Sequence, residues 1–205
     1  MRKLFFLTVW SLFITLAPQT LFADTKPALE IGDDEFVIGN KDAPITIIEY
    51  ASMSCSHCAS FHNNTLPDIK KEYIDTGIVR MVFRDYPFNY PALLGSMMMR
   101  CIPGDVRYDY MNALYQLQPN WVNRDPKITK KELYKIMQSG GMTKDEFDTC
   151  YGDLDNENLI LEGVMAAQKD FNIKSTPSFI INGNLLEGNK NIKEFRQIID
   201  KILSE

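Results

Sequence analysis

The stretch "EYASMSCSHCASFH", Glu49 to His62, contains two of the four cysteines and both histidines of the 205-residue chain. Its first two residues are the end of "ITIIEY" (residues 45–50), whose nearly continuous apolar and β-branched residues predict a buried parallel strand. From Cys58 onward the apolar residues recur at helical spacing, so the two cysteines lie where a strand passes into a helix. Such a cluster is compatible with a metal site, with a redox couple, or with residues that share no function.

A C-x-x-C pair that follows a strand and opens a helix has a physical logic as a redox couple. Cys55 would lie at the helix N-terminus, where unpaired backbone N–H groups and the positive end of the helix dipole stabilise a thiolate. Cys58 lies one turn further along and deeper, so we assign Cys55 as the nucleophile and Cys58 as the resolving thiol. Ser56 and His57 are expected to tune the couple, because a histidine beside the sulfur favours the thiolate and makes the disulfide a stronger oxidant.

Zinc ligation by Cys55, Cys58 and His62 is the competing interpretation. A closed structural zinc site needs four ligands, and the chain has neither a second C-x-x-C nor a third histidine. His62 follows Cys55 by seven residues, and we expect it to cap or pack locally rather than to join the redox site. The cluster Met97–Met99 could suggest a soft metal, but methionine fills gaps in a core more often. We therefore predict no metal site.

Glu49 interrupts the apolar strand six residues before Cys55. A carboxylate in such a strand is costly unless it is solvated, paired or used. Two interpretations stay open from the residues alone. Glu49 is either a strand residue that faces solvent, or a group beneath the motif that accepts the proton of Cys58.

The N-terminus differs in kind from the rest of the chain. Two basic residues precede "LFFLTVWSLFITLA", fourteen residues without a charge. This pattern predicts a secretory signal peptide over residues 1–23 and a polar connector over residues 24–34. The apolar run is short for a membrane span, although its extension beyond Pro18 leaves an uncleaved membrane anchor as the alternative.

Export changes what the four cysteines mean, because thiols in an oxidising compartment tend to pair. If Cys55 pairs with Cys58, then Cys101 is left to pair with Cys150. We expect this second bond to be structural, and the alternative is a second redox couple. The net charge is −5 and the basic residues are scattered, so no nucleic-acid partner is expected.

The remaining patterns give the order of the elements. "IVRMVF" (residues 78–83) predicts a second strand, so residues 45–83 form one strand-helix-strand unit. Residues 91–170 contain only helical patterns. "SFIING" (residues 178–183) and "NLLEG" predict a hairpin with an Asn-Gly turn, and an amphipathic helix follows over residues 192–203.

Together, "ITIIEYASMSCSHCASFH", the helical block and "IKSTPSFIINGNLLEG" resemble the DsbA-type thiol-disulfide oxidoreductases of the thioredoxin superfamily. The resemblance covers the chain from about Phe36 to its end. It implies an α/β, thioredoxin-like fold formed by residues 35–90 and 171–205. It also implies an inserted α-helical domain over residues 91–170.

The resemblance also assigns roles to single residues. The family's motif commonly has proline where Ser56 stands, so its mechanism carries over more directly than its redox potential. The family's buried acidic residue matches Glu49 in type and spacing, which implies a role in proton transfer. The family's cis-proline corresponds to Pro177, and the backbone beside it, including Thr176, is implied to bind the substrate strand.

The function implied is that of an exported, periplasmic oxidase. It would donate the Cys55–Cys58 disulfide to reduced secreted proteins through a mixed disulfide, with no cofactor beyond that disulfide. A membrane quinone-linked partner of the DsbB kind would reoxidise it. A disulfide isomerase or reductase of the same superfamily is the nearest alternative, although dedicated isomerases usually carry a dimerisation domain before the thioredoxin domain. The remaining alternative is a metal-binding or chaperone module without enzymatic activity.

Overall fold

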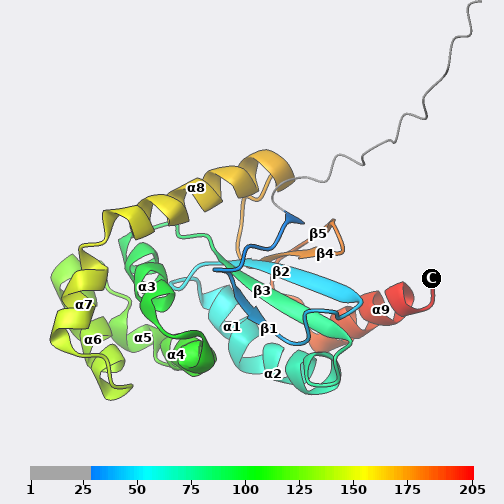
Figure 1. The fold of residues 1–205 in the computed structure, drawn as a ribbon, viewed down its shortest axis with the longest axis horizontal. Helices are drawn as coiled ribbons and strands as arrows, with labels where there is room; N and C mark the ends of the chain where they lie inside the picture. The colour runs from blue at the N-terminus through cyan, green and yellow to red at the C-terminus, as the bar shows by residue number, and fades with distance from the viewer. Residues whose placement is uncertain (1–28) are drawn as a thin grey trace, which may run out of the picture.

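A computed structural model describes residues 29–205 of the chain (Figure 1). The predicted signal peptide, residues 1–23, and the first part of the connector lie outside the described residues. None of the helices between residues 29 and 205 combines the length and the apolar composition that a membrane span requires.

A five-stranded mixed sheet forms the centre of the fold, with strand order β1-β3-β2-β4-β5. Strands β2 and β3 are parallel, and the other neighbouring pairs are antiparallel. The middle strand, β2, is buried along nearly its whole length, as the apolar run predicted. The strands are β1 (Phe36–Ile38), β2 (Ile45–Ala51), β3 (Val79–Asp85), β4 (Ser178–Ile181) and β5 (Asn184–Glu187).

Helices cover both faces of the sheet and one of its ends (Figure 1). Helices α1, α2 and α9 lie on one face, α8 crosses the other, and α3 to α7 form a block at one end. The helices are α1 (Ser56–Asn64), α2 (Leu66–Ile69), the π-helical segment η2 (Lys70–Ile74), α3 (Tyr90–Cys101), α4 (Gly104–Gln116), α5 (Gln118–Trp121), α6 (Pro126–Ser139), α7 (Lys144–Tyr151), α8 (Leu154–Phe171) and α9 (Ile192–Leu203).

The alternation of side chains along β2 divides the apolar core into two clusters and places Glu49. Ile47 belongs to the larger cluster, which includes residues of α1, α2 and α9. Ile48 and Tyr50 point to the opposite face, where Phe171 of α8 packs. Glu49 is two residues beyond Ile47 and therefore lies on the face that α1 covers.

The structure departs from the sequence-based prediction in two short elements. Strand β1 has only three residues, which pair with β3 at the sheet edge, and four-residue helix α5 follows α4 directly. Neither is long enough to show a period in the sequence. The first helix is interrupted near Pro67, because α1 ends at Asn64 and Pro67 lies in the first turn of α2. The division into two domains stays a prediction.

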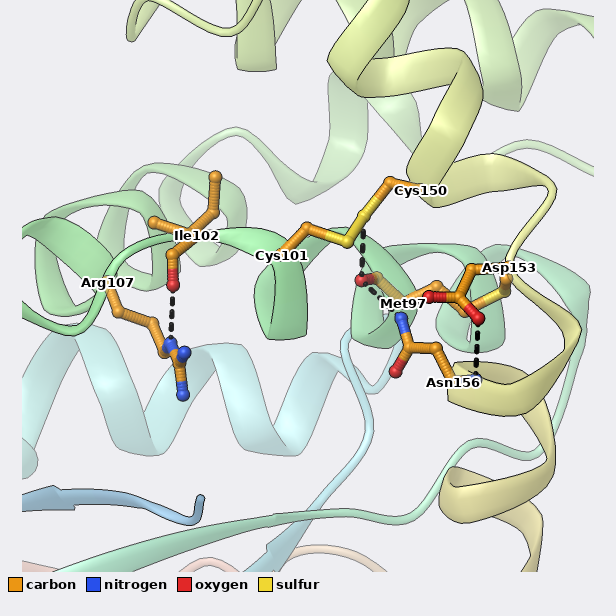
Figure 2. Close-up of a disulfide and its surroundings, with 7 residues drawn as sticks. All are labelled: Met97, Cys101, Ile102, Arg107, Cys150, Asp153 and Asn156. Atoms are coloured by element: carbon orange, nitrogen blue, oxygen red, sulfur yellow. Dashed lines mark hydrogen bonds between the residues drawn. A yellow bond between two sulfur atoms is a disulfide. The ribbon is translucent and has the colours of Figure 1, made fainter. Parts of the chain in front are cut away.

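The structure pairs Cys101 with Cys150, as expected, with their Cα atoms 6.3 Å apart. Cys101 is the last residue of α3 and Cys150 lies in α7 (Figure 2). Beside the bond, the Asn156 side chain of α8 donates to the Met97 carbonyl oxygen at 3.1 Å. Helices α3, α7 and α8 are therefore joined at this point. Met97–Met99 are 0–4% exposed and belong to the core, as predicted.

Replacement of both Cys101 and Cys150 by serine should lower the free energy of unfolding by up to roughly 4 kcal/mol. This is the chain-entropy value for a closed loop of about 50 residues. Urea denaturation of the wild type and the double variant measures the loss. The folded double variant should still oxidise a reduced test protein. Loss of turnover without loss of fold would show instead that this pair carries electrons.

Candidate active site

Cys55 and Cys58 lie at the point where β2 ends and α1 begins. Cys55 is the N-cap residue of α1 with extended backbone dihedrals, and no side chain caps the first turn. The N–H groups of that turn are therefore open to the Cys55 sulfur. Cys55 is partly exposed, Cys58 is fully buried, and both are free thiols in the structure. The predicted strand-to-helix corner is confirmed.

The two thiols differ strongly in acidity. A hydrogen bond from the Cys58 thiol lowers the pKa of Cys55 to about 5, with help from Thr176 and the backbone N–H groups of Cys58 and His57, and against the effect of burial. Burial raises the pKa of Cys58 far above its ordinary value, and the hydrogen bond to Cys55 and the charge of Glu49 act in the same direction. This difference supports Cys55 as the nucleophile.

The side chains of Ser56 and His57 are exposed to solvent. The contribution of His57 to the acidity of Cys55 comes from its backbone N–H group. A tuning role for the two side chains stays a prediction.

The loop before β4 faces the cysteines, although more than 100 residues separate them in the chain. The Thr176–Pro177 peptide bond is cis, as the resemblance implied. The Cys55 thiol donates a hydrogen bond to the Thr176 carbonyl oxygen at 3.4 Å. The backbone of this loop is therefore next to the Cys55 sulfur.

Glu49 has no exposed surface, so the interpretation that it faces solvent is wrong. Its carboxylate oxygens lie 2.9 and 3.1 Å from Nε2 of His62. His62 is 3% exposed and its ring stacks on Tyr115, with the centroids 4.0 Å apart. The expectation that His62 caps or packs locally is therefore also wrong, because it forms a buried pair with Glu49.

One pattern in the sequence could have indicated the Glu49–His62 pair. Cys58 and His62 are four residues apart, so they lie on the same face of α1. The side chain of Cys58 is on the buried face of α1, and the charge of Glu49 acts on its thiol. A histidine one turn beyond Cys58 would thus meet a carboxylate on the strand below.

The helical block contributes a residue that the sequence did not indicate. The Gln118 side chain donates to the carbonyl oxygens of Met53 and Cys55, at 2.9 and 3.1 Å. It therefore fixes the backbone on both sides of the turn into α1. No local pattern distinguishes Gln118, because its contacts are with residues more than 60 positions away.

Between residues 29 and 205 no group of three or more histidine, cysteine, aspartate or glutamate side chains has an arrangement that could hold a metal ion.

The chain matches the thioredoxin family model over residues 32–201. It is 32% identical over 183 residues to a Rickettsia felis protein named for protein-disulfide oxidoreductase activity, covering 88% of this chain. It is 26% identical over 174 residues to disulfide bond formation protein D of Bacillus subtilis, covering 82% of this chain and 76% of that one. The structure of alpha-DsbA1 from Wolbachia pipientis superimposes with a TM-score of 0.80 at 29% identity, over 86% of this chain and 94% of that one. The chain spans 64% of the length of the Rickettsia felis protein, less than two thirds.

The reactivity of Cys55 should follow its lowered pKa. Because its thiolate predominates above about pH 5, alkylation of the reduced protein by iodoacetamide should reach half its plateau rate near that pH. Cys58 should stay unmodified, and the Cys58→Ser variant measures how much of the shift depends on the thiol. A half-plateau pH near 8.5, the ordinary cysteine value, would contradict the assignment.

Proposed function

Because this chain belongs to the thioredoxin family and is similar to DsbA proteins in sequence and fold, we propose that it is an exported protein disulfide oxidase. Its Cys55–Cys58 disulfide would be donated to reduced secreted proteins in the periplasm. No cofactor beyond that disulfide is required. Resemblance to the family implies that a membrane quinone-linked protein of the DsbB kind reoxidises the cysteine pair.

The reaction has two exchange steps. A substrate thiolate attacks the Cys55 sulfur of the oxidised protein, the Cys55–Cys58 bond breaks, and Cys58 leaves with the electron pair and takes a proton from Glu49. A second substrate thiolate then attacks the substrate sulfur of the mixed disulfide, and Cys55 leaves as a thiolate. Two electrons have passed from the substrate to the cysteine pair, and the substrate holds a disulfide.

The position of the Cys55 sulfur, at the uncapped N-terminus of α1 and beside the Cys58 thiol, supports an oxidase best, because it lowers the pKa of Cys55. A stable Cys55 thiolate is a good leaving group in the second step. It also stabilises the reduced form, which makes the disulfide a stronger oxidant. An isomerase or reductase would share the same corner and the same cis-proline loop, so the redox potential separates these alternatives.

The equilibrium of the Cys55–Cys58 pair with glutathione buffers should give a potential closer to that of DsbA, roughly −120 mV, than to that of thioredoxin, roughly −270 mV. The Cys55→Ala variant should lose all oxidation of a reduced test protein, whereas the matched Cys101→Ser, Cys150→Ser variant should keep it. A potential near that of thioredoxin would overturn the oxidase assignment and favour a reductase.

A further inference from the structure

We propose that His62 is a positioning residue for Glu49, and that it balances each proton exchanged between Glu49 and Cys58 with a proton exchanged at a cavity behind the active site. The proposal rests on the proposed thiol-disulfide exchange and deepens it. It assigns a role to the second histidine of the chain and to the cavity that its ring lines.

The burial of the Glu49–His62 pair sets the physical problem. A carboxylate without contact to water is strongly disfavoured unless a partner compensates its charge. Nε2 of His62 lies within hydrogen-bond distance of both Glu49 oxygens. The same enclosure would disfavour a lone imidazolium when Glu49 takes up a proton. A pair that stays neutral in both states avoids both costs.

The other ring nitrogen of His62 provides the outlet. Nδ1 is buried and has no hydrogen-bond partner among the described residues, and the same holds for the Tyr115 hydroxyl. Both residues line a cavity of about 400 Å³. Burial raises the pKa of Tyr115 well above its ordinary value, so its hydroxyl stays protonated and can donate. Two polar atoms without partners in the described part of the chain therefore lie just behind the inner wall of the cavity, where a water molecule that entered between the side chains would satisfy both.

The cavity extends from His62 to the surface of the molecule. Its inner wall includes the buried residues Met53 and Tyr115, and its outer wall includes Asp34 and Ala166, which are exposed. Solvent that enters at the outer wall can therefore approach the His62 ring without passing the cysteines, and exchange at Nδ1 requires a small movement of the cavity wall. The charged groups along the walls are Asp34, Glu35, Arg84, Asp85, Arg100, Arg107 and Asp170.

The groups that pack on the His62 ring leave Glu49 as its ionisable partner. Tyr115 of α4 stacks on one side, and Phe83 of β3 and Phe61 of α1 are the other aromatic neighbours. The Cys58 thiol lies on the same face of α1 and within the field of Glu49. The ring can therefore hold Glu49 through Nε2 and exchange a proton with the cavity at Nδ1.

The proton count closes over both halves of the reaction. Before Cys58 is deprotonated, Glu49 is ionised and His62 carries protons on both nitrogens. The S–H proton of Cys58 then passes to Glu49, and the sulfur electron pair of Cys58 forms the bond to Cys55. At the same time the Nδ1 proton of His62 passes to water in the cavity. When the disulfide is later donated, Glu49 returns a proton to the Cys58 thiolate and Nδ1 takes one from the cavity. The pair is neutral throughout.

The test isolates the closure step. Reduced protein is converted to the glutathione mixed disulfide at Cys55. Closure is the next step, in which Cys58 attacks Cys55, the Cys55–Cys58 disulfide forms and glutathione is released. Stopped-flow fluorescence follows this release between pH 5 and 9. His62→Gln keeps an N–H donor for Glu49 but cannot gain or lose a proton. Closure should slow about tenfold in His62→Gln and about a hundredfold in Glu49→Gln. The double variant should be no slower than Glu49→Gln, because the two side chains act as one unit.

Two further measurements separate a proton role from a structural one. Imidazole added to His62→Ala should restore closure through the cavity, whereas the same concentration of sodium chloride should not. Met99→Leu, a change of similar volume in the cavity wall, is the matched control and should close at the wild-type rate.

Closure at the wild-type rate in His62→Gln, multiplicative slowing in the double variant, or a lack of rescue by imidazole would overturn the proposal. The half-plateau pH of Cys55 alkylation should be unchanged in His62→Gln. Failure of the wild type to oxidise proteins would count against the proposed function alone, because closure of the glutathione adduct tests His62 without a protein substrate.

Discussion

The difference in depth between Cys55 and Cys58 is the constraint on which the rest of the site depends. One helical turn takes the chain from a partly exposed sulfur at the helix N-terminus to a sulfur with no exposed surface. The first position stabilises a thiolate and the second penalises one. The two thiols thereby differ in acidity through their positions and through the hydrogen bond between them, since their chemistry is otherwise identical. Everything else in the site either maintains this difference or manages its consequence for Cys58.

That consequence is the need for a proton acceptor beneath the helix. A buried thiol whose pKa is raised cannot attack a mixed disulfide until it loses its proton. Glu49 lies on the face of β2 that α1 covers, and burial of its carboxylate in turn requires His62. In the proposed reaction the requirements run from Cys58, which must lose a proton, to Glu49, which would accept it, and then to His62, which compensates the buried charge of Glu49.

Local patterns predicted the parts of the site that local backbone structure determines. β2, the start of α1 and the hairpin follow from apolar runs and from the Asn182-Gly183 turn, where both residues have positive φ as such a turn requires. The cis-proline opposite the cysteines was predicted from the family resemblance and not from a local pattern. The Glu49–His62 pair and Gln118 were not predicted, because their partners are fixed by packing between distant segments. Even there, the spacing of Cys58 and His62 carried a usable signal.

The helical block connects the Cys101–Cys150 disulfide to the candidate active site. Gly95 of α3 lies so close to its neighbours that a Cβ atom there would come within 2.9 Å of Met53 and 3.0 Å of Trp121. Met53 precedes the C-x-x-C motif, and its carbonyl oxygen accepts the Gln118 hydrogen bond. The Cys101–Cys150 bond anchors the C-terminal end of the same helix, α3, to α7. The position of the backbone before Cys55 is therefore set from both sides, by the sheet through β2 and by the helical block through Gly95 and Gln118. A thioredoxin sheet alone would supply only the first of these restraints.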